Sequence, residues 1–300
     1  MEEAIKKADV LIEAMPYILS FAGKPVVIKF GGNAMESDAV LDDVLEDVVF
    51  LAAVGIRPIV VHGGGPQISS AMEQAGLSPQ FVGGHRVTDA ATLEVVVRVL
   101  TERVNADILR RIRAFGGRGV PGFRDGHSLL KARRKVLEAP DEDGAPQELD
   151  LGYVGEVVAV ETEPMLSQAA AGAVMAVPPI GQDETGQLYN VNADTAAGAV
   201  AAAIGAEKVV FLSNVHGIMA RPGDTASLLS TVAEGEVRRM MAQGVISGGM
   251  LPKVSACIAA LGAGVRKAHI IDGRLPHSLL PEIFTDRGVG TQILRGAGGP

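Results

Sequence analysis

The sequence has 300 residues, of which 47% are hydrophobic, and a formal net charge of -8. This length and composition suffice for a large buried core, arranged either as one α/β domain or as two lobes. Nucleic acids and anionic membranes require a basic surface on their partners, so the acidic balance argues against both. The single cysteine, Cys257, excludes an internal disulfide framework and a thiolate metal site, which fits a reducing cytoplasm.

The N-terminal segment predicts a helix rather than a targeting signal. The first twenty residues begin acidic and contain no apolar run of signal-peptide length, so no export signal is predicted and the expected location is cytoplasmic. Apolar residues recur there at three- and four-residue spacing, which predicts a helix over residues 1–16 that Pro16 ends. Such a helix packs on its own domain or against a neighbouring subunit. No apolar run reaches the roughly 20 residues that cross a bilayer, so no membrane partner is expected.

Short β-branched runs alternate with helical patterns along the chain. This alternation is typical of βαβ units around a mainly parallel sheet with helices on both faces. The clearest strands are predicted at residues 26–30, 58–61, 173–177, 208–212 and 268–271. Helices are predicted at residues 39–53, 66–75, 90–114, 193–204, 234–243 and 251–261.

One stretch, residues 116–156, interrupts this rhythm with glycine, proline and an acidic run. It predicts a hairpin excursion from the main fold. We infer two lobes in one compact unit, residues 17–180 and 181–300, behind the N-terminal helix.

Lys29 precedes Gly31 and Gly32 at the end of the first predicted strand, directly before a helical pattern. Glycines at this place let backbone N–H groups approach an anion, and the lysine supplies a compact positive charge. The pattern predicts a phosphate cradle. Because the chain contains no G-x-x-x-x-G-K-[ST] motif, a conventional P-loop NTPase is not expected.

A second glycine cluster, Gly63 to Gly65, follows His62 at the end of the next predicted strand and again opens a helix. Three successive glycines are costly to order, so a merely structural turn seldom needs them all. Ligands of open α/β sheets bind at the carboxyl edge of the strands, which favours a functional interpretation of the two clusters together. The G-x-G-x-x-G match at residues 117–122 follows a helix rather than a strand and is interpreted as coincidental.

Four polar or charged side chains elsewhere in the sequence are further candidates for ligand binding. Arg86 lies in a glycine-flanked loop, where it could bind a carboxylate through two parallel hydrogen bonds, although a lone arginine is more often a surface residue. Asn190 could donate to a ligand carbonyl or carboxylate, and Asp194 could orient lysines or a metal-bound phosphate. Asn192 or Asp194 would serve equally well as a helix N-cap. Lys253 lies in the first turn of a helix, where a cation is unfavourable without an anion, so it predicts a phosphate contact.

The chain resembles the amino acid kinase family from about residue 12 to residue 293. The likeness is carried, in order, by residues 28–35, 61–66, 84–88, 189–194 and 248–253. Each motif alone is moderate evidence, but five in sequence are specific. The resemblance implies a three-layer αβα sandwich with a mainly parallel central sheet. It also implies that the N-terminal lobe binds an acylamino acid and the C-terminal lobe binds ATP.

The resemblance further implies an ATP-dependent transfer to a side-chain carboxylate, with N-acetyl-L-glutamate as the expected acceptor. Mg²⁺ would accompany ATP, and no protein-bound structural metal is expected. Lys29 and Lys253 would stabilise the transferring phosphoryl group while Asp194 orients them. The substrate would be bound by Gly64, Gly65, Arg86 and Asn190. The nucleotide would be bound by Gly31, Gly32, Ser213, Asn214, Gly217 and Gly249, with Asn214 standing where the family usually has an aspartate.

Two segments resemble the arginine-inhibited, hexameric branch of the family. They are the Met15-Pro16-Tyr17 step and residues 277–288. In that branch the N-terminal helices interlace between dimers, which implies a homohexamer built as a trimer of dimers. Counterparts of Tyr17, Glu282 and Gly288 border the site for L-arginine there.

Two alternatives remain. A relative could act on glutamate, aspartate or an aminoadipate derivative. Glutamate and aspartate kinases commonly append a C-terminal domain, for which little chain remains after Ile293, whereas length does not exclude an aminoadipate-type enzyme. A protein of the same fold could also bind a ligand without catalysis. Retention of both lysines, Asp194 and both glycine loops argues against that second alternative.

Overall fold

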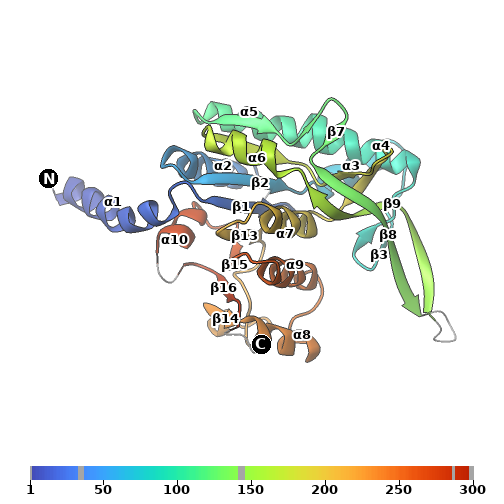
Figure 1. Ribbon diagram of the computed structural model, residues 1–300. Coiled ribbons are helices and arrows are strands. Elements are labelled where there is room, and N and C mark those ends of the chain that lie inside the picture. Colours follow the sequence, from blue (N-terminus) through green and yellow to red (C-terminus); the bar gives the residue numbers. More distant parts are fainter. Residues whose placement is uncertain (1, 33–36, 141–145, 286–287, 297–300) are drawn as a thin grey trace.

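A computed structural model describes residues 2–32, 37–140, 146–285 and 288–296. An eight-stranded sheet runs through the described chain in the order β14-β16-β15-β13-β1-β2-β10-β5 (Figure 1). Its strands are β1 (Pro25–Phe30), β2 (Arg57–His62), β5 (Arg118–Pro121), β10 (Ala173–Val177), β13 (Lys208–Ser213), β14 (Thr231–Ala233), β15 (Lys267–Asp272) and β16 (Thr291–Leu294). Neighbouring strands pair in parallel except β15 and β16, which are antiparallel.

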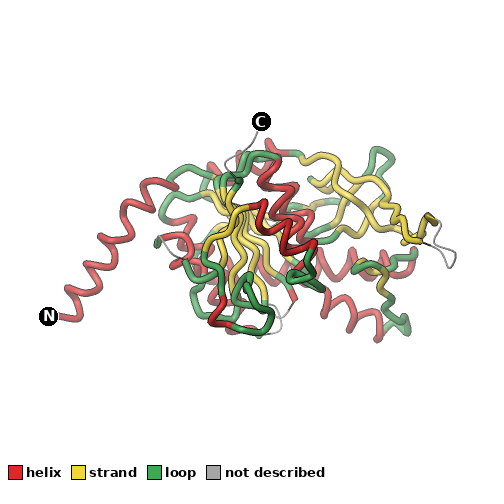
Figure 2. The backbone as a smooth tube through the Cα atoms, turned by 90° about the horizontal axis from the view of Figure 1, so that it is seen from below, coloured by secondary structure: helices red, strands yellow, loops and turns green. Residues whose placement is uncertain are grey.

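Helices cover both faces of this sheet (Figure 2). Alternate residues of β1 enter different hydrophobic clusters: Val26 and Ile28 pack on one side, and Val27 packs on the other. The first cluster includes side chains of α2 (Asp38–Ala53), α3 (Gly65–Gln74), α4 (Ala90–Arg98), α5 (Ala106–Ala114) and α10 (Leu279–Phe284). The second includes side chains of α6 (Thr162–Ala170), α7 (Ala193–Ala203), α8 (Glu234–Ala242) and α9 (Met250–Gly262). The predicted three-layer α/β fold with a mainly parallel sheet is confirmed.

The predicted strands and helices agree with the structure to within one residue at either end, except for the N-terminal helix, described below, and one other. The helix predicted at residues 90–114 consists of α4, a π-helical segment (Val99–Asn105) and α5. The periodicity of apolar residues did not predict the π-helical segment, whose turns are wider than those of an α-helix. Strands β5, β14 and β16 have only three or four residues each and were not predicted. Helix α6 was not predicted either.

The hairpin predicted at residues 116–156 is displaced in the structure. Its first residues form β5, an edge strand of the main sheet that accommodates Pro121 because one side has no strand neighbour. The hairpin itself is β8 (Leu130–Pro140) and β9 (Pro146–Val160), which extends from the body in Figure 1. With β11 (Ile180–Gln182) and β12 (Leu188–Val191) it closes a four-stranded barrel. Smaller elements are β6 (Phe123–Arg124), β7 (His127–Ser128) and a 3₁₀ turn (Thr225–Ser227).

The prediction that Pro16 ends the first helix is wrong. Helix α1 (Glu2–Phe21) continues through Pro16. An internal proline costs about 3 kcal/mol, and the packing of Tyr17, Ile18 and Phe21 against the hydrophobic core offsets this cost. The preceding part of α1 projects from the body (Figure 1). No helix among the described residues is long and apolar enough to span a membrane.

One glycine joins the barrel to the loop that carries Arg86. Arg86 belongs to β4 (His85–Arg86), which pairs with β3 (Phe81–Val82). Beyond β4, Thr88 forms a parallel bridge with Gly152 of β9, and its carbonyl accepts from the N–H of Tyr153 at 2.6 Å. A Cβ at Gly152 would lie 2.2 Å from the carbonyl oxygen of Thr88, and its φ is +72°. The close approach therefore requires glycine.

We predict that Gly152→Ala lowers the free energy of unfolding by about 1–3 kcal/mol more than Gly76→Ala, because the added methyl group overpacks a backbone contact. Gly76 is the matched control, since it has the same φ of +72° and no atom within 4 Å of the added Cβ. Urea denaturation of the two variants measures the difference. Equal destabilisation would show that the bridge tolerates a side chain.

Candidate active site

Lys29, Asp194 and Lys253 meet at the carboxyl edge of the sheet. Lys29 Nζ lies 2.7 Å from Asp194 Oδ1, and Lys253 Nζ donates to Asp194 Oδ2 at 3.0 Å. The Lys29 contact is an ion pair that lies off the hydrogen-bond direction. The three residues come from β1 and the first turns of α7 and α9, far apart in sequence. The structure therefore brings together the three residues predicted to be catalytic.

Burial and charge act against each other in this cluster. Burial lowers the pKa of Lys29, the Asp194 carboxylate counters that effect, and Lys253 adds to it. Burial raises the pKa of Asp194, but attraction by the two lysines outweighs burial, and the pKa lies below its ordinary value. With all three groups ionised the cluster carries a net charge of +1. A buried net positive charge favours an anionic ligand.

The start of α7 leaves the Asp194 carboxylate available to the lysines. Asn192 is the N-cap of the helix, and its Oδ1 accepts from the N–H groups of Asp194 and Thr195. Of the two N-cap candidates in the sequence, Asn192 takes the role. The unfavourable position of Lys253 in the first turn of α9 is relieved within the protein by Asp194.

The two glycine loops touch each other beside this cluster. The N–H of Gly63 donates to the carbonyl of Phe30 at 2.7 Å. A Cβ at Gly31 would lie 2.9 Å from the Cα of Gly63, so any side chain there would separate the loops. Gly32 continues the first loop, and the motif residues Asn33 to Met35 lie outside the described residues.

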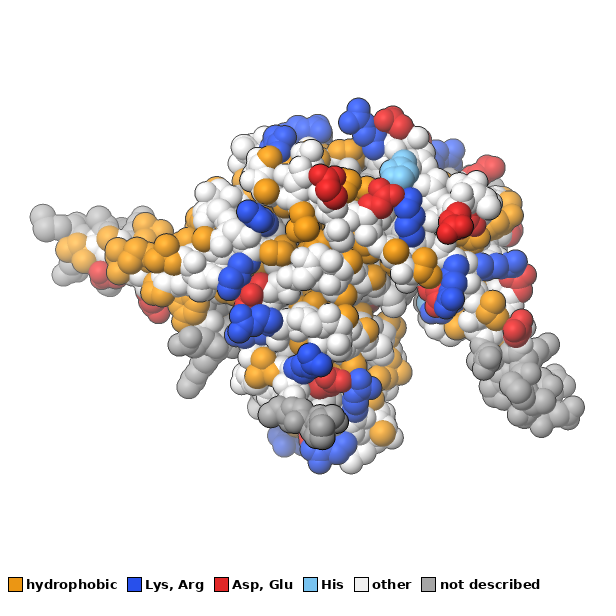
Figure 3. Space-filling view, in the orientation of Figure 1, with side chains coloured by type: hydrophobic (Ala, Val, Ile, Leu, Met, Phe, Trp, Pro, Cys, Tyr) orange, Lys and Arg blue, Asp and Glu red, His pale blue; other side chains and the backbone are white. Residues whose placement is uncertain are grey.

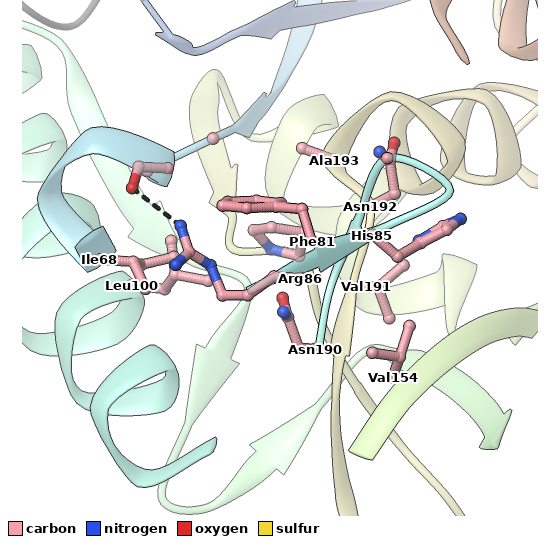
Figure 4. A pocket seen from close by; sticks show the side chains of 15 residues that line it. Ile68, Phe81, His85, Arg86, Leu100, Val154, Asn190, Val191, Asn192 and Ala193 are labelled. Carbon is pink, nitrogen blue, oxygen red and sulfur yellow. Dashed lines mark hydrogen bonds between the residues drawn. The ribbon is translucent and has the colours of Figure 1, made fainter. Parts of the chain in front are cut away.

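Arg86 is buried, with 7% of its surface exposed, in a set of neutral groups. Its guanidinium donates to Ser69 Oγ at 2.9 Å, to the Gly65 carbonyl at 3.2 Å and to Met72 Sδ at 3.2 Å. It also lies 4.6 Å from the ring centroid of Phe81. Figure 4 shows the hydrogen bond to Gly65 and the ring of Phe81 beside the guanidinium. No acidic partner of Arg86 occurs among the residues that the structure describes.

A cavity of about 160 Å³ adjoins Arg86 (Figure 4). Its walls include Gly64 and Gly65 from the second glycine loop and Asn190 from β12. Asn190 Nδ2 donates to Thr88 Oγ1 at 3.1 Å, which fixes the amide against the Arg86 loop. The other lining residues are Gly63, Ile68, Phe81, Gly84, His85, Leu100, Val154, Pro179, Val191, Asn192 and Ala193. All four residues predicted to bind the substrate therefore line one cavity, whose wall reaches the residue before Asp194.

The residues predicted to bind the nucleotide lie at neighbouring strand and helix ends. Ser213 ends β13, the sheet neighbour of β1, and the exposed Asn214 and the buried Gly217 follow it. Gly249 is the N-cap of α9, four residues before Lys253. These positions surround the same edge of the sheet as Gly31 and Gly32.

Tyr17, Glu282 and Gly288 line a second cavity of about 90 Å³. Glu282 is buried and contacts His269, and its Oε2 accepts from the N–H of Val289 at 2.7 Å. Burial raises the pKa of Glu282, but the hydrogen bond and charge of His269 outweigh it and hold the pKa below its usual range. The three residues predicted to bind arginine are thus brought together.

Several residues of the two cavities were not found from the sequence. Ser69, Met72 and Phe81 surround Arg86, and Lys208 and His269 line the second cavity. They carry no motif, and only tertiary packing shows their neighbours. Lys208 Nζ donates to the carbonyl of Glu282 at 3.0 Å, and burial lowers the pKa of Lys208 to about 8.

Among the described residues no group of three or more His, Cys, Asp or Glu side chains could hold a metal ion. Magnesium in kinases is bound largely by nucleotide phosphates and water. The pairing of both Asp194 oxygens with lysines fits an ion that arrives with ATP.

The sequence from residue 24 to residue 272 matches the model of the amino acid kinase family. The chain is 46% identical over 295 residues to the acetylglutamate kinase of Heliobacterium modesticaldum, covering 98% of this chain and 100% of that protein. The chain therefore belongs to the amino acid kinase family.

Two solved structures of the N-acetylglutamate synthase of Neisseria gonorrhoeae share the fold at 27% identity. One, complexed with coenzyme A and N-acetyl-glutamate, has a TM-score of 0.82 and covers 97% of this chain. The other, complexed with coenzyme A and L-arginine, has a TM-score of 0.76 and also covers 97%. This chain spans 64% and 66% of the length of those synthase chains.

We predict that Asp194→Asn lowers the pKa of Lys29 further and destabilises the fold by roughly 3–5 kcal/mol, the cost of leaving a buried charge without its partner. The pKa of Lys29 should fall because Asp194 raises it in the wild-type protein, whereas Lys253, which remains, lowers it. NMR titration of ¹³C-labelled lysine Cε and chemical denaturation measure the two effects. Asp125→Asn, at an exposed position, is the control, and an unshifted Lys29 titration would contradict the prediction.

Proposed function

We propose that the chain transfers the γ-phosphoryl group of ATP to the side-chain carboxylate of N-acetyl-L-glutamate, giving N-acetyl-L-glutamyl 5-phosphate in arginine biosynthesis. The observation that carries the proposal is the pairing of two ionic features. A buried guanidinium without an acidic partner in the described chain adjoins a cavity. Ala193 in the wall of that cavity directly precedes Asp194 of the Lys29–Asp194–Lys253 cluster. The name of the Heliobacterium relative supports the choice of substrate.

The chain's groups account for both halves of such a transfer. Arg86 would bind the α-carboxylate of the acceptor through parallel hydrogen bonds, and Asn190 would bind the adjacent polar group. The backbones of Gly64 and Gly65 would direct the γ-carboxylate towards the lysines. A glutamate side chain has a pKa near 4.3 and is already ionised at neutral pH. The acceptor therefore needs no general base.

The lysines would then stabilise the transferring group. Phosphoryl transfer relies mostly on positioning and charge stabilisation. Lys29 and Lys253 would contact the phosphoryl oxygens from two sides, while Asp194 holds both amines in place. Magnesium bound with ATP would supply further charge neutralisation.

The nucleotide would be bound mainly by residues 181–300 and the acylamino acid mainly by residues 17–180. Gly31 and Gly32 would contribute from the first lobe, and Ser213, Asn214, Gly217 and Gly249 from the second. The common sheet supports this division, because β1 and β13 are adjacent and present both sets of residues at one edge. We place the enzyme in the cytoplasm.

The second cavity would bind L-arginine as a feedback inhibitor. Its buried carboxylate, Glu282, is suited to a guanidinium or an α-amino group, and Tyr17 and Gly288 form other parts of its wall. The synthase complexed with L-arginine supports the idea that proteins of this fold bind this amino acid.

The projecting part of α1 would join dimers into a hexamer. Val10, Leu11 and Ile12 are each more than 60% exposed, and Figure 3 shows hydrophobic side chains along this projection. A contiguous exposed apolar surface of this kind favours burial against another subunit. Because Tyr17 lies in the same helix, assembly and the arginine site would be linked.

An assay of ADP release tests the substrate. We expect turnover with N-acetyl-L-glutamate and at least 10²-fold lower kcat/KM with glutamate, aspartate and an aminoadipate derivative, because a site built around specific polar contacts rejects poorly fitting acceptors. Preference for another acceptor would replace the proposed substrate. Absence of turnover with all of them would indicate a ligand-binding protein.

We predict that Lys253→Ala lowers kcat by about 10²-fold or more with the fold intact, the size expected for losing one charge-stabilising contact. Lys29→Ala should behave alike. Lys24→Ala is the matched control, because Lys24 is exposed and pairs with Glu207 away from the cluster. Turnover near that of the control would remove the lysine concerned from the mechanism.

Deletion of residues 1–16 tests the assembly and its regulation. We expect dimers in place of hexamers and a weaker inhibition by arginine, because the exposed apolar surface is removed and Tyr17 loses its helical support. Sedimentation velocity and the arginine dose response measure both. Persistent hexamers with unchanged inhibition would contradict the prediction.

A further inference from the structure

A histidine and an asparagine outside the cavity wall form a buried polar pair behind the second glycine loop. His62 ends β2 with 0% of its surface exposed, and Asn105 ends the π-helical segment with 3% exposed. His62 Nδ1 lies 2.9 Å from the carbonyl oxygen of Gly63. Asn105 Nδ2 lies 3.0 Å from His62 Nε2 and donates to the carbonyl of Ala176 at 2.9 Å.

These contacts fix the protonation of the pair. A carbonyl oxygen only accepts, so His62 Nδ1 carries the proton and donates to Gly63. The amide nitrogen of Asn105 faces Ala176 for the same reason, and its second N–H points to Nε2, which accepts. Burial lowers the pKa of His62 to about 4, although the bond to Gly63 acts in the opposite direction. The imidazole is therefore neutral at ordinary pH.

His62 and Asn105 hold the peptide plane that contains the Gly63 carbonyl and the Gly64 N–H. The N–H of Gly63 is bound to Phe30, and its carbonyl is bound to His62. In a trans peptide the carbonyl of one residue and the N–H of the next point in opposite directions. Fixing the Gly63 carbonyl towards the interior thus turns the N–H of Gly64 away from it. Gly64 lines the cavity, and the described residues offer its N–H no hydrogen-bond partner.

We propose that His62 and Asn105 are positioning residues for phosphoryl transfer, which lock the Gly63–Gly64 peptide so that the Gly64 N–H faces the reacting carboxylate and phosphoryl oxygens. The inference rests on the proposed function of the adjoining cavity. It assigns the pair no contact with substrate, since neither side chain lines the cavity and both imidazole nitrogens are engaged. His62 consequently does not act as a general base.

Paired substitutions of His62 separate positioning from packing. In His62→Asn the side-chain amide occupies the place of Nδ1 and can still donate to Gly63, whereas in His62→Gln the amide occupies the place of Nε2. We expect about 10²-fold loss of kcat in His62→Gln, as for one missing transition-state donor, and at most about 10-fold loss in His62→Asn. KM for N-acetyl-L-glutamate should change less than about threefold in both, because Arg86 and Asn190 remain.

The pH dependence of kcat in Asn105→Asp tests the positioning role, because a role in packing alone would leave that dependence unchanged. A carboxylate at residue 105 raises the pKa of His62 and draws its proton to Nε2. The doubly protonated imidazole keeps the bond to Gly63, and the neutral one loses it. The kcat of this variant should therefore fall as pH rises through the new pKa of His62. The wild-type protein should show no such fall at that pH. Thr101→Ala in the same π-helical segment, and His127→Asn at an exposed histidine, are the controls and should retain the wild-type profile.

Three outcomes would overturn the inference while N-acetyl-L-glutamate turnover by the wild-type enzyme upholds the proposed function. The first is an equal loss of kcat in His62→Asn and His62→Gln. The second is a kcat of His62→Gln within about threefold of the wild-type value, and the third is a pH profile of kcat in Asn105→Asp that matches the wild type. ¹⁵N NMR of the histidine rings in the ligand-free wild-type protein tests the inference independently of turnover. The Nδ1–H form of His62 is expected, and the Nε2–H form would refute the proposal even if another acceptor proved to be the substrate.

Discussion

The site depends on one buried carboxylate held between two ammonium groups. Asp194 keeps Lys29 and Lys253 close together although like charges repel, and the cluster retains one positive charge that the protein does not neutralise. Placing such a charge where water is scarce is unfavourable unless an anion arrives to compensate it. The same imbalance that costs stability therefore provides affinity for a polyanion. Lys29 is rigid because it belongs to a strand with neighbours on both sides.

The topology of the sheet explains why the cluster can form. Strand β1 lies between β2 and β13 and pairs in parallel with both, so the chain leaves β1 and β2 at the same carboxyl edge. Two loops leaving adjacent strands would normally be kept apart by side chains. The contact between Gly31 and Gly63 removes that spacing and lets backbone N–H groups from both loops approach one anion.

Much of this arrangement follows from the sequence, for physical reasons. The five predicted strands are continuous apolar runs because both faces are buried, and the glycine loops and Asp194 lie at element ends where motifs are local. The rest depends on tertiary contacts that leave no local pattern. Pro121 conceals an edge strand, and Asn105 lies in a helical stretch whose π turn gives no periodic signal. Pro16 remains helical only because residues after it pack on the core.

The two cavities lie at opposite edges of the same sheet: Gly64 and Gly65 follow the carboxyl end of β2, and Lys208 and Lys267 begin β13 and β15. Lys208, at the amino end of β13, lines the Glu282 cavity, and Ser213 ends the same strand at the sheet edge where β1 leads into its glycine loop. Six strand residues span about 17 Å, so a ligand in one cavity cannot touch a phosphoryl group at the other. Any coupling must act through a change that both ligands bias. Helix α1 would be suited to this role, because it contributes Tyr17 and Phe21 to the cavity and is joined by a short turn to β1, the strand that carries Lys29.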